Sequence, residues 1–237
     1  MIKAVVFDMF ETLVTLFEGR TYFSEDIAAD INMPAEAFRD AWHATEHDRS
    51  IGKLTIEEGL FIALNKLGVY SEDKVELITT KRKEALNDTF SNIPDNSIQL
   101  LNTLHDSHIK TGLITNTFSD ERDFIRNSPL FPLLDLSLIS YEQGVCKPDL
   151  SLYHSMAELL CVKPYECLYV GDGGSRELFA AKEIGMNVVQ AAWFSDRAFE
   201  PHIPCPILKE FTQAWNQMDI MKLIRNINFS QVVQFLL

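Results

Sequence analysis

The stretch IKAVVFDMFET, residues 2–12, decides the fold. Its first six residues form a short β-rich run that ends abruptly at Asp8, which is the pattern of a strand buried on both faces. Similar runs recur at residues 111–115, 136–140, 167–170 and 187–191, separated by stretches with helical spacing. This alternation predicts an α/β fold with a Rossmann-like, doubly wound parallel sheet, and it places Asp8 at the carboxyl end of the first strand.

The segments between the later strands carry helix signals. Residues 150–160 have apolar side chains at three- and four-residue spacing, which predicts one buried face. Those side chains are Leu152, Met156, Leu159 and Leu160. The pattern of residues 177–184 predicts a second helix. Gly185 is expected to end it by adopting the left-handed conformation just past its last turn. The tail from about residue 201 is irregular before a final helix predicted at residues 211–224.

Residues 16–90 interrupt the alternation with four helical stretches and no convincing strand. One of these helices has a predicted buried face made of Phe38, Ala41, Trp42 and Thr45. Thr55 with Glu58 predicts a capping box at the start of another, and Ser71 starts the fourth. We therefore expect an α/β core of residues 1–15 and 91–237 and a small helical cap domain of residues 16–90, with hinges at Gly19 and near residues 91–94.

Composition limits the class of partner. The formal net charge of -13 and the pI near 4.8 disfavour nucleic acid, because electrostatic attraction to phosphates supplies most non-specific affinity. A membrane span needs roughly 18 to 20 apolar residues, and no such stretch occurs. The four cysteines form no CxxC pair, and no signal-peptide pattern precedes the first strand. We expect a cytoplasmic monomer or homodimer that acts on a small molecule without nucleic-acid or membrane partners.

Four polar clusters mark the candidate site, because ligands of such sheets bind outside the carboxyl ends of the strands. They are residues 8–12 (DMFET), 115–117 (TNT), 147–149 (KPD) and 171–177 (GDGGSRE). An isolated Asp after a strand is more often a turn or a helix cap than a nucleophile. Four such clusters in this chain order favour a catalytic site.

Together the clusters resemble the four-motif signature of the haloacid dehalogenase superfamily, over most of the chain outside the cap. The resemblance implies a hydrolase in which Asp8 attacks phosphorus or carbon, Thr115 donates a hydrogen bond to the transferred group, and Lys147 neutralises the developing negative charge. Thr12 and Asn116 are then expected to contact the substrate. A carboxylate nucleophile suits this chemistry, because it divides hydrolysis into two easier steps.

The same resemblance implies a magnesium site. Asp8 and Asp172 would hold Mg²⁺ with the backbone carbonyl of Phe10, and Glu177 would order the water shell of the metal. Mg²⁺ prefers one or two carboxylates together with water and substrate oxygens, which agrees with this set.

The sequence departs from the phosphatases of the superfamily at Phe10, where those enzymes usually carry a second Asp that protonates the leaving group. Phenylalanine cannot transfer a proton, and losing a positioned general acid costs on the order of 10² to 10⁴ in rate. Unactivated phosphate monoesters are therefore expected to be poor substrates. Glu11 stands where Gly is usual and should point away from the site, and Glu177 replaces a more common Asp.

Two other branches of the superfamily also lack the second Asp. The 2-haloacid dehalogenases resemble this chain at Phe10 and in the spacing of Tyr153, but they are metal-independent, and the acidic residues Asp172 and Glu177 favour the metal-binding branch. Tyr153 also suits an aromatic helix residue that faces the sheet. Phosphonoacetaldehyde hydrolase uses a cap lysine, for which Lys53 is the candidate.

The cap is expected to select the substrate through Arg20, Arg49 and Lys53. The leading interpretation is a Mg²⁺-dependent phosphohydrolase acting on a small phosphorylated or otherwise anionic metabolite. A carbon-centred hydrolase is the first alternative, and a catalytically weak binding or regulatory protein is the second. The pattern His43-Ala44-Thr45-Glu46-His47 matches that of inverted zinc proteases, but it is short and has no strong third ligand.

Overall fold

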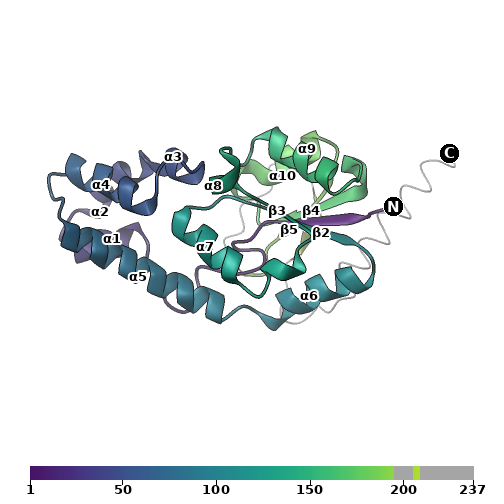
Figure 1. The fold of residues 1–237 in the computed structure, drawn as a ribbon, viewed down its shortest axis with the longest axis horizontal. Coiled ribbons are helices and arrows are strands. Elements are labelled where there is room, and N and C mark those ends of the chain that lie inside the picture. Colours follow the sequence, from purple (N-terminus) through teal and green to yellow (C-terminus); the bar gives the residue numbers. More distant parts are fainter. Residues whose placement is uncertain (195–204, 209–237) are drawn as a thin grey trace.

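The structure is a computed structural model, of which residues 1–194 and 205–208 are described here. The helix predicted at residues 211–224 lies outside these residues. The described chain contains a parallel sheet flanked by helices and a second group of helices at one end of the molecule (Figure 1).

The sheet has six parallel strands in the order β3-β2-β1-β4-β5-β6, which confirms the predicted α/β class. The strands are β1 (Ala4–Phe7), β2 (Lys110–Thr115), β3 (Leu136–Ile139), β4 (Cys167–Gly171), β5 (Asn187–Ala191) and β6 (Ile207–Leu208). The first five lie within a few residues of their predicted positions. The two-residue β6 was not predicted, because so short an edge strand carries no periodic signal.

Helices cover both faces of the sheet. Val5 and Phe7 of β1 point into a core shared with α6 (Asp95–Asp106) and α7 (Ser119–Asn127), whereas Ala4 and Val6 face α9 (Leu150–Leu159) and α10 (Glu177–Glu183). This alternation follows from the two-residue period of a strand. Three of the four residues predicted for the apolar face of α9 are buried, but Leu159 is 60% exposed. The buried face also includes Tyr153 and Ala157, so it is rotated away from Leu159.

Five helices, one more than predicted, follow β1. They are α1 (Ser24–Asp30), α2 (Ala35–His43), α3 (Glu46–Ser50), α4 (Ile56–Lys66) and α5 (Glu72–Ser91). The extra element, α3, is only five residues long. The helices bury a hydrophobic cluster of their own, which includes Phe38 and Trp42, and they lie beyond the end of the sheet opposite the N-terminus (Figure 1). Their action as a mobile cap domain with the predicted boundaries stays a prediction.

Local sequence signals set the ends of these helices as expected. The Glu58 backbone N–H donates to Thr55 Oγ1 at 3.2 Å, and the Thr55 N–H donates to Glu58 Oε2 at 2.8 Å. The Ser71 hydroxyl oxygen accepts the Lys74 N–H at 3.3 Å. Each cap satisfies backbone donors that the first helical turn leaves without partners.

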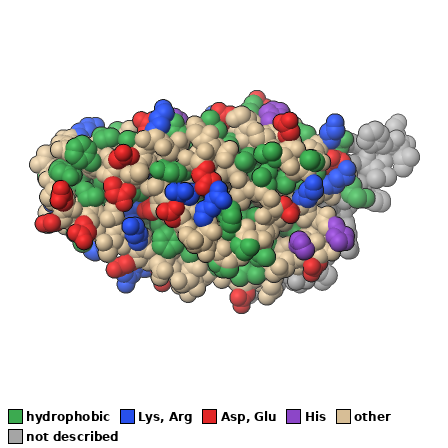
Figure 2. Space-filling model, in the orientation of Figure 1, with side chains coloured by type: hydrophobic (Ala, Val, Ile, Leu, Met, Phe, Trp, Pro, Cys, Tyr) green, Lys and Arg blue, Asp and Glu red, His purple; other side chains and the backbone are tan. Residues whose placement is uncertain are grey.

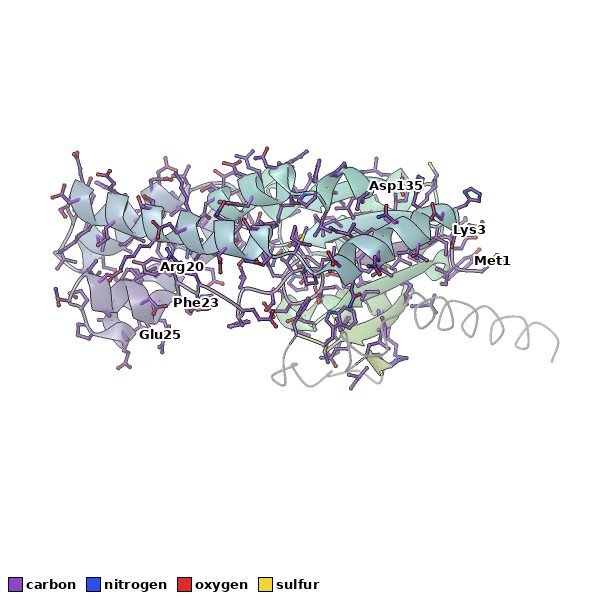
Figure 3. The ribbon with its side chains drawn as sticks, turned by 90° about the horizontal axis from the view of Figure 1, so that it is seen from below. Met1, Lys3, Arg20, Phe23, Glu25 and Asp135 are labelled. Atoms are coloured by element: carbon purple, nitrogen blue, oxygen red, sulfur yellow. The ribbon has the colours of Figure 1, made fainter. Side chains whose placement is uncertain are left out.

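The connection that leads from the sheet to α1 lies beside the last turn of α5. The Arg20 N–H on the outgoing connection donates to Asp88 Oδ2 on α5 at 2.7 Å. Gly19 has φ +72°, and a side chain there would place its Cβ 2.2 Å from the same oxygen. Figure 3 shows Arg20, Phe23 and Glu25 on the side of these helices, far from Lys3 and Asp135. Hinge motion at Gly19 and residues 91–94 stays a prediction.

The surface is mixed in character. Figure 2 shows acidic and basic side chains interspersed on one face, with hydrophobic side chains scattered between them. Among the described residues, no helix combines the length and apolar character that crossing a bilayer would require.

The core of the helices α1–α5 predicts a contrast between two phenylalanines. Phe38 is fully buried, so Phe38→Ala is expected to lower the free energy of unfolding by about 3 to 5 kcal/mol in urea denaturation. Phe61 on the neighbouring helix is 52% exposed with its ring against Tyr70, and Phe61→Ala is expected to cost about 1 kcal/mol. Equal losses in the two variants would contradict this packing.

Candidate active site

The candidate site lies where the order of the sheet reverses. From β1 the chain adds β2 and β3 toward one edge of the sheet, and it then adds β4, β5 and β6 toward the other edge. The carboxyl ends of β1 and β4 are therefore neighbours at the reversal. Asp8 follows β1 and Asp172 follows β4, and the Asp8 N–H donates to the Val170 carbonyl at 2.9 Å. Two acidic side chains from distant parts of the sequence are therefore neighbours at the position where such sheets bind ligands.

A buried lysine joins the carboxylates of this edge. Lys147 Nζ lies 2.6 Å from Asp8 Oδ1 and 2.6 Å from Glu177 Oε2, and all three side chains are at most 8% exposed. Glu177 also accepts hydrogen bonds from the Tyr169 hydroxyl at 2.8 Å and from the Gly173 N–H at 3.1 Å. Both oxygens of Glu177 are thus engaged within the protein, which suits a positioning role.

Gly171, at the end of β4, leaves room for Glu177. A Cβ at residue 171 would lie 2.0 Å from Glu177 Oε1, so any side chain there would displace the carboxylate. This close approach accounts for the glycine at the start of the fourth motif.

Asp8, Asp172 and Glu177 form a carboxylate cluster whose oxygens lie within 4.8 Å of one another. It is the one group of three or more His, Cys, Asp or Glu side chains with metal-ligand spacing in the described part of the chain. Asp172 accepts the Gly174 N–H at 2.8 Å, and its backbone carbonyl accepts from the Gln190 amide at 2.8 Å. Mg²⁺ prefers one or two carboxylates together with water, so Asp8 and Asp172 fit that ion, while both oxygens of Glu177 are engaged by other residues.

Burial and mutual repulsion perturb these carboxyl groups. Burial raises the pKa of Asp8 to about 6, with Glu177 adding to the rise and Lys147 opposing it. Burial and the nearby Asp8 raise the pKa of Asp172 to about 6. The two anions raise the pKa of Lys147 well above its usual range against the opposing effect of burial. The lysine is therefore a fixed cation, and the cluster around it remains rich in negative charge.

Asn116 holds the lysine loop in place. Its Oδ1 accepts the Lys147 N–H at 2.8 Å, and its Nδ2 donates to the Lys147 carbonyl and to Ser175 Oγ at 3.3 Å each. Thr115 is buried at the end of β2, and its hydroxyl donates to the Asn116 carbonyl at 3.4 Å. The amide of Asn116 therefore connects three of the four motifs, a role that its position in the sequence did not reveal.

The residues after Asp8 adopt a tight loop. Glu11 has φ +57°, and its carboxylate accepts from the Thr15 hydroxyl and the Leu16 N–H at 2.8 Å each, which agrees with the expectation that it points away from the site. Phe10 is half-buried, with its ring 6.4 Å from that of Phe90 in an edge-on contact. Thr12 is fully buried, and its Oγ1 has no hydrogen-bond partner among the described residues.

Tyr153 lies fully buried on α9, where its ring packs 5.5 Å from that of Tyr169. This position agrees with an aromatic helix residue that faces the sheet. Its hydroxyl has no hydrogen-bond partner in the described part of the chain, and burial raises its pKa.

A cavity of about 430 Å³ separates the candidate site from the helices α2 and α3. On the sheet side its lining includes Asn116, Cys146, Lys147, Ser175 and Arg176, and on the helix side it is lined by His43, Glu46, His47 and Ser50. His43 and His47 were noted in the sequence only as a zinc pattern. They belong to no metal-ligand cluster among the described residues, and the structure places them over the cavity instead.

The three cap residues expected to contact the substrate lie in different environments. Arg49 is buried and lines a second cavity of about 260 Å³, and Arg20 lines the same cavity while pairing with Glu84 at the surface. The Lys53 side chain is 66% exposed, pairs with Asp48 at 3.5 Å and lines neither cavity. A Schiff-base lysine needs burial to lower its pKa, so nothing in its surroundings favours that role.

A family model described as haloacid dehalogenase-like hydrolase matches residues 2–185. The chain belongs to this family. The match covers most of the chain and includes Asp8, Lys147 and Asp172, which the fold brings together.

Two curated relatives of this haloacid dehalogenase-like hydrolase are similar over parts of their lengths. Rhythmically expressed gene 2 protein of Drosophila melanogaster is 36% identical over 92 residues, which span 38% of this chain and 35% of that protein. A protein named as a phosphatase of Mycobacterium tuberculosis is 27% identical over 178 residues, which span 72% of this chain and 79% of that protein.

Solved structures share the fold at low sequence identity. A haloacid dehalogenase family enzyme of Bacteroides thetaiotaomicron, crystallised with magnesium and inorganic phosphate, aligns with a TM-score of 0.59 at 17% identity over 80% of this chain and 94% of its own. L-2-haloacid dehalogenase of Xanthobacter autotrophicus aligns with a TM-score of 0.62 at 20% identity over 95% of this chain and 99% of its own. The fold is thus shared by a family enzyme solved with magnesium and inorganic phosphate and by a 2-haloacid dehalogenase.

The buried cluster predicts a pH-dependent penalty for removing its lysine. Lys147→Met leaves Asp8, Asp172 and Glu177 without their cation, and we expect the metal-free protein to lose about 3 to 5 kcal/mol of unfolding free energy at pH 7.5. The carboxyl groups, whose folded-state pKa values are already raised, bind protons more readily than in the unfolded chain, so the loss should shrink as the pH falls to 5.5. Denaturation in urea at both pH values measures this.

The matched control is Lys3→Met, which removes an exposed lysine paired with Glu166 at 2.6 Å. A surface pair of this kind contributes at most about 1 kcal/mol. A Lys147→Met loss as small as that of the control, or one that does not change with pH, would contradict the electrostatic account.

Proposed function

We propose that this protein is a Mg²⁺-dependent phosphohydrolase that acts on a small phosphorylated metabolite, with Asp8 as the nucleophile. The observation that carries the proposal is the buried constellation of Asp8, Lys147, Asp172 and Glu177 at the reversal of the sheet. The similarity to a protein named as a phosphatase supports it.

Lys147 keeps the nucleophile in its reactive form. Its ion pair with Asp8 favours the carboxylate over the carboxylic acid, against the burial that raises the Asp8 pKa. A carboxylate oxygen of Asp8 attacks phosphorus, the bond from phosphorus to the substrate oxygen breaks, and an acyl phosphate forms on the side chain. Water then cleaves the acyl phosphate, which releases inorganic phosphate and restores Asp8.

Asp8 and Asp172 are the residues that would hold Mg²⁺, with the backbone carbonyl of Phe10 as a further oxygen ligand. When bound, the ion neutralises charge on the phosphoryl oxygens and orients the group toward the nucleophile. Glu177 keeps Lys147 and the Gly173 loop in register with the two aspartates through its three hydrogen bonds. Thr115, buried at the end of β2, would donate to the transferred group by turning its hydroxyl away from the Asn116 carbonyl.

Phe10 limits the substrates that the site can process. Its side chain cannot protonate a leaving alkoxide, and Glu11 is turned toward Thr15 and Leu16 instead of serving as a substitute acid. Substrates whose leaving group is stable as an anion, such as acyl phosphates and aryl phosphates, need no protonation. We therefore expect turnover of these compounds to exceed that of alkyl phosphates.

A direct test uses a panel of phosphorylated metabolites with and without Mg²⁺, scored by release of inorganic phosphate. Asp8→Asn is expected to lower kcat by roughly 10³-fold or more, because the amide cannot form the covalent intermediate. EDTA should abolish the activity, and added Mg²⁺ should restore it. Glu11→Gln, a change in the same loop, is the control and should retain activity. Full activity in Asp8→Asn would refute the assignment of the nucleophile.

Restoring an acid at residue 10 tests the role of the missing proton donor. Phe10→Asp is expected to raise kcat on alkyl phosphates by about tenfold or more, since a positioned general acid contributes on the order of 10² to 10⁴. Phe10→Ala removes the same ring contact with Phe90 but supplies no acid, so it separates proton transfer from loosened packing. No gain in a folded, metal-binding Phe10→Asp protein would count against a phosphatase.

Phe10 also favours a second candidate, a carbon-centred hydrolase that displaces a leaving group needing no proton. In that case Asp8 attacks carbon, a halide or similar anion departs, and water cleaves the resulting ester. Activity on 2-haloacids that persists in EDTA would support this function over the first. The acidic cluster of Asp8, Asp172 and Glu177 favours the metal-dependent phosphohydrolase.

A further inference from the structure

Arg49 on α3 is a buried cation that forms no ion pair within the described part of the chain, where Glu121 and Glu46 act on it only at longer range. It is 1% exposed, which makes it one of the largest fully buried side chains of the described chain. The nearby Arg82 is paired with Asp120 at 2.8 Å and with Glu121 at 3.4 Å, whereas Arg49 forms no ion pair with any residue that the structure describes. Removing a guanidinium from water without a partner is unfavourable, so its retention at this position calls for an explanation.

Two aromatic rings stack on the guanidinium, and one of its nitrogens has no hydrogen-bond partner among the described residues. Its central carbon lies 3.5 Å from the centre of the Trp42 ring and 4.1 Å from that of Phe118. Nε donates to Thr45 Oγ1 at 3.0 Å, and Nη2 donates to the Trp42 carbonyl at 3.1 Å. Nη1 is buried and has no hydrogen-bond partner among the described residues. The stacked, hydrogen-bonded plane thus holds Nη1 in a fixed position as a charged donor, which can form a charge-assisted hydrogen bond with a carboxylate oxygen.

This arginine lines the cavity of about 260 Å³ between α1, α2, α5 and α7. The lining contains three arginines, of which Arg20 pairs with Glu84, and Arg82 pairs with Asp120 and Glu121. Arg49 is the one arginine of this lining that forms no ion pair with a described residue. The rest of the lining is largely apolar or aromatic. Glu46 and His43 line both this cavity and the one that reaches Lys147.

Helix α4 is built to accommodate Arg49. Gly59 lies against the side chain, and a Cβ there would approach Arg49 Cδ to 2.5 Å. The glycine therefore creates the space that lets the arginine lie flat between Trp42 and Phe118. Arginines that serve only through their apolar stem usually keep the charged end in water. The guanidinium of Arg49 is instead enclosed.

We propose that this cavity binds the carboxylate of a small organic molecule with an apolar body, through the free edge of Arg49, with Trp42 and Phe118 enclosing the bound group. The carboxylate has two conceivable sources, the far end of the substrate itself or a separate ligand. The first source rests on the proposed function, because it requires a substrate that carries a phosphoryl group and a carboxylate. Binding at the cavity does not require turnover.

Benzoate is a suitable probe, and benzamide is its neutral match. Isothermal titration calorimetry on the full chain should show saturable benzoate binding and benzamide binding weaker by at least about tenfold, since a charge-assisted hydrogen bond is lost. Arg49→Gln is expected to weaken benzoate binding by a similar factor. Arg39→Gln, on α2 and paired with Glu25 at the surface, is the control and should bind as the unchanged protein does.

Two further measurements keep the test decisive if Arg49→Gln fails to fold. Gly59→Ala displaces the arginine without removing it and should weaken benzoate binding. In the unchanged protein, nuclear Overhauser contacts between the benzoate ring and the rings of Trp42 and Phe118 should locate the ligand. Equal binding of benzoate and benzamide, unaltered benzoate affinity in folded Arg49→Gln, or the lack of these ring contacts would overturn the proposal.

Kinetics then separate the two sources of the carboxylate. If the group belongs to the substrate, benzoate should inhibit competitively. In addition, kcat/KM for phosphorylated carboxylic acids should exceed kcat/KM for their amides, and this difference should disappear in Arg49→Gln. If it belongs to a separate ligand, benzoate should bind without competing with the substrate. Because calorimetry detects binding without catalysis, a failed phosphatase assay leaves the binding result intact, and failed binding leaves the phosphatase proposal intact.

Discussion

The ion pair of Lys147 with Asp8 and Glu177 is the interaction on which the site depends. It joins a side chain at the end of β1 to residues 139 and 169 positions later in the chain, and it does so where water is excluded. With Asp172 included, three carboxylates surround one lysine, so the fully ionised cluster carries a formal charge of -2. Protonation near pH 6 or a bound cation relieves that charge, and a divalent ion matches it in magnitude.

The sheet order explains why these groups meet. A parallel sheet places every carboxyl end at one edge, and the reversal between β1 and β4 leaves a crevice there that no crossover helix covers. The apolar strands provide rigid positions. The side-chain amide of Asn116 fixes the loop by bonding to the backbone of Lys147, which leaves the Lys147 side chain free to pair with the carboxylates. The positions of the charged groups are thus set by secondary structure and by one amide, which favours a preorganised site.

The core was more predictable from the sequence than the helices α1–α5 were. The strands, the family and the grouping of Asp8 with Lys147 and Asp172 were predictable, because strand patterns and polar residues at strand ends depend on local sequence and on the topology of a parallel sheet. The placement of His43 and His47 over the cavity was not, because it depends on how α2 and α3 are rotated against the core. Leu159 was misassigned for a related reason, since apolar spacing alone does not fix how a helix is rotated, and the buried face of α9 includes Tyr153 and Ala157 instead.

Two buried cations make different demands on their surroundings. Lys147 is surrounded by more negative charge than it can neutralise, whereas Arg49 is enclosed by the faces of two aromatic rings and forms no ion pair among the described residues. Ring faces stabilise a cation but do not use the donors at its edge. A bound cation would balance the excess of carboxylates around Lys147, and a bound anion would pair with the donor that Arg49 leaves without a partner among the described residues. A small molecule with an anionic group at each end would meet both demands, provided that the two cavities lined by His43 and Glu46 are filled together.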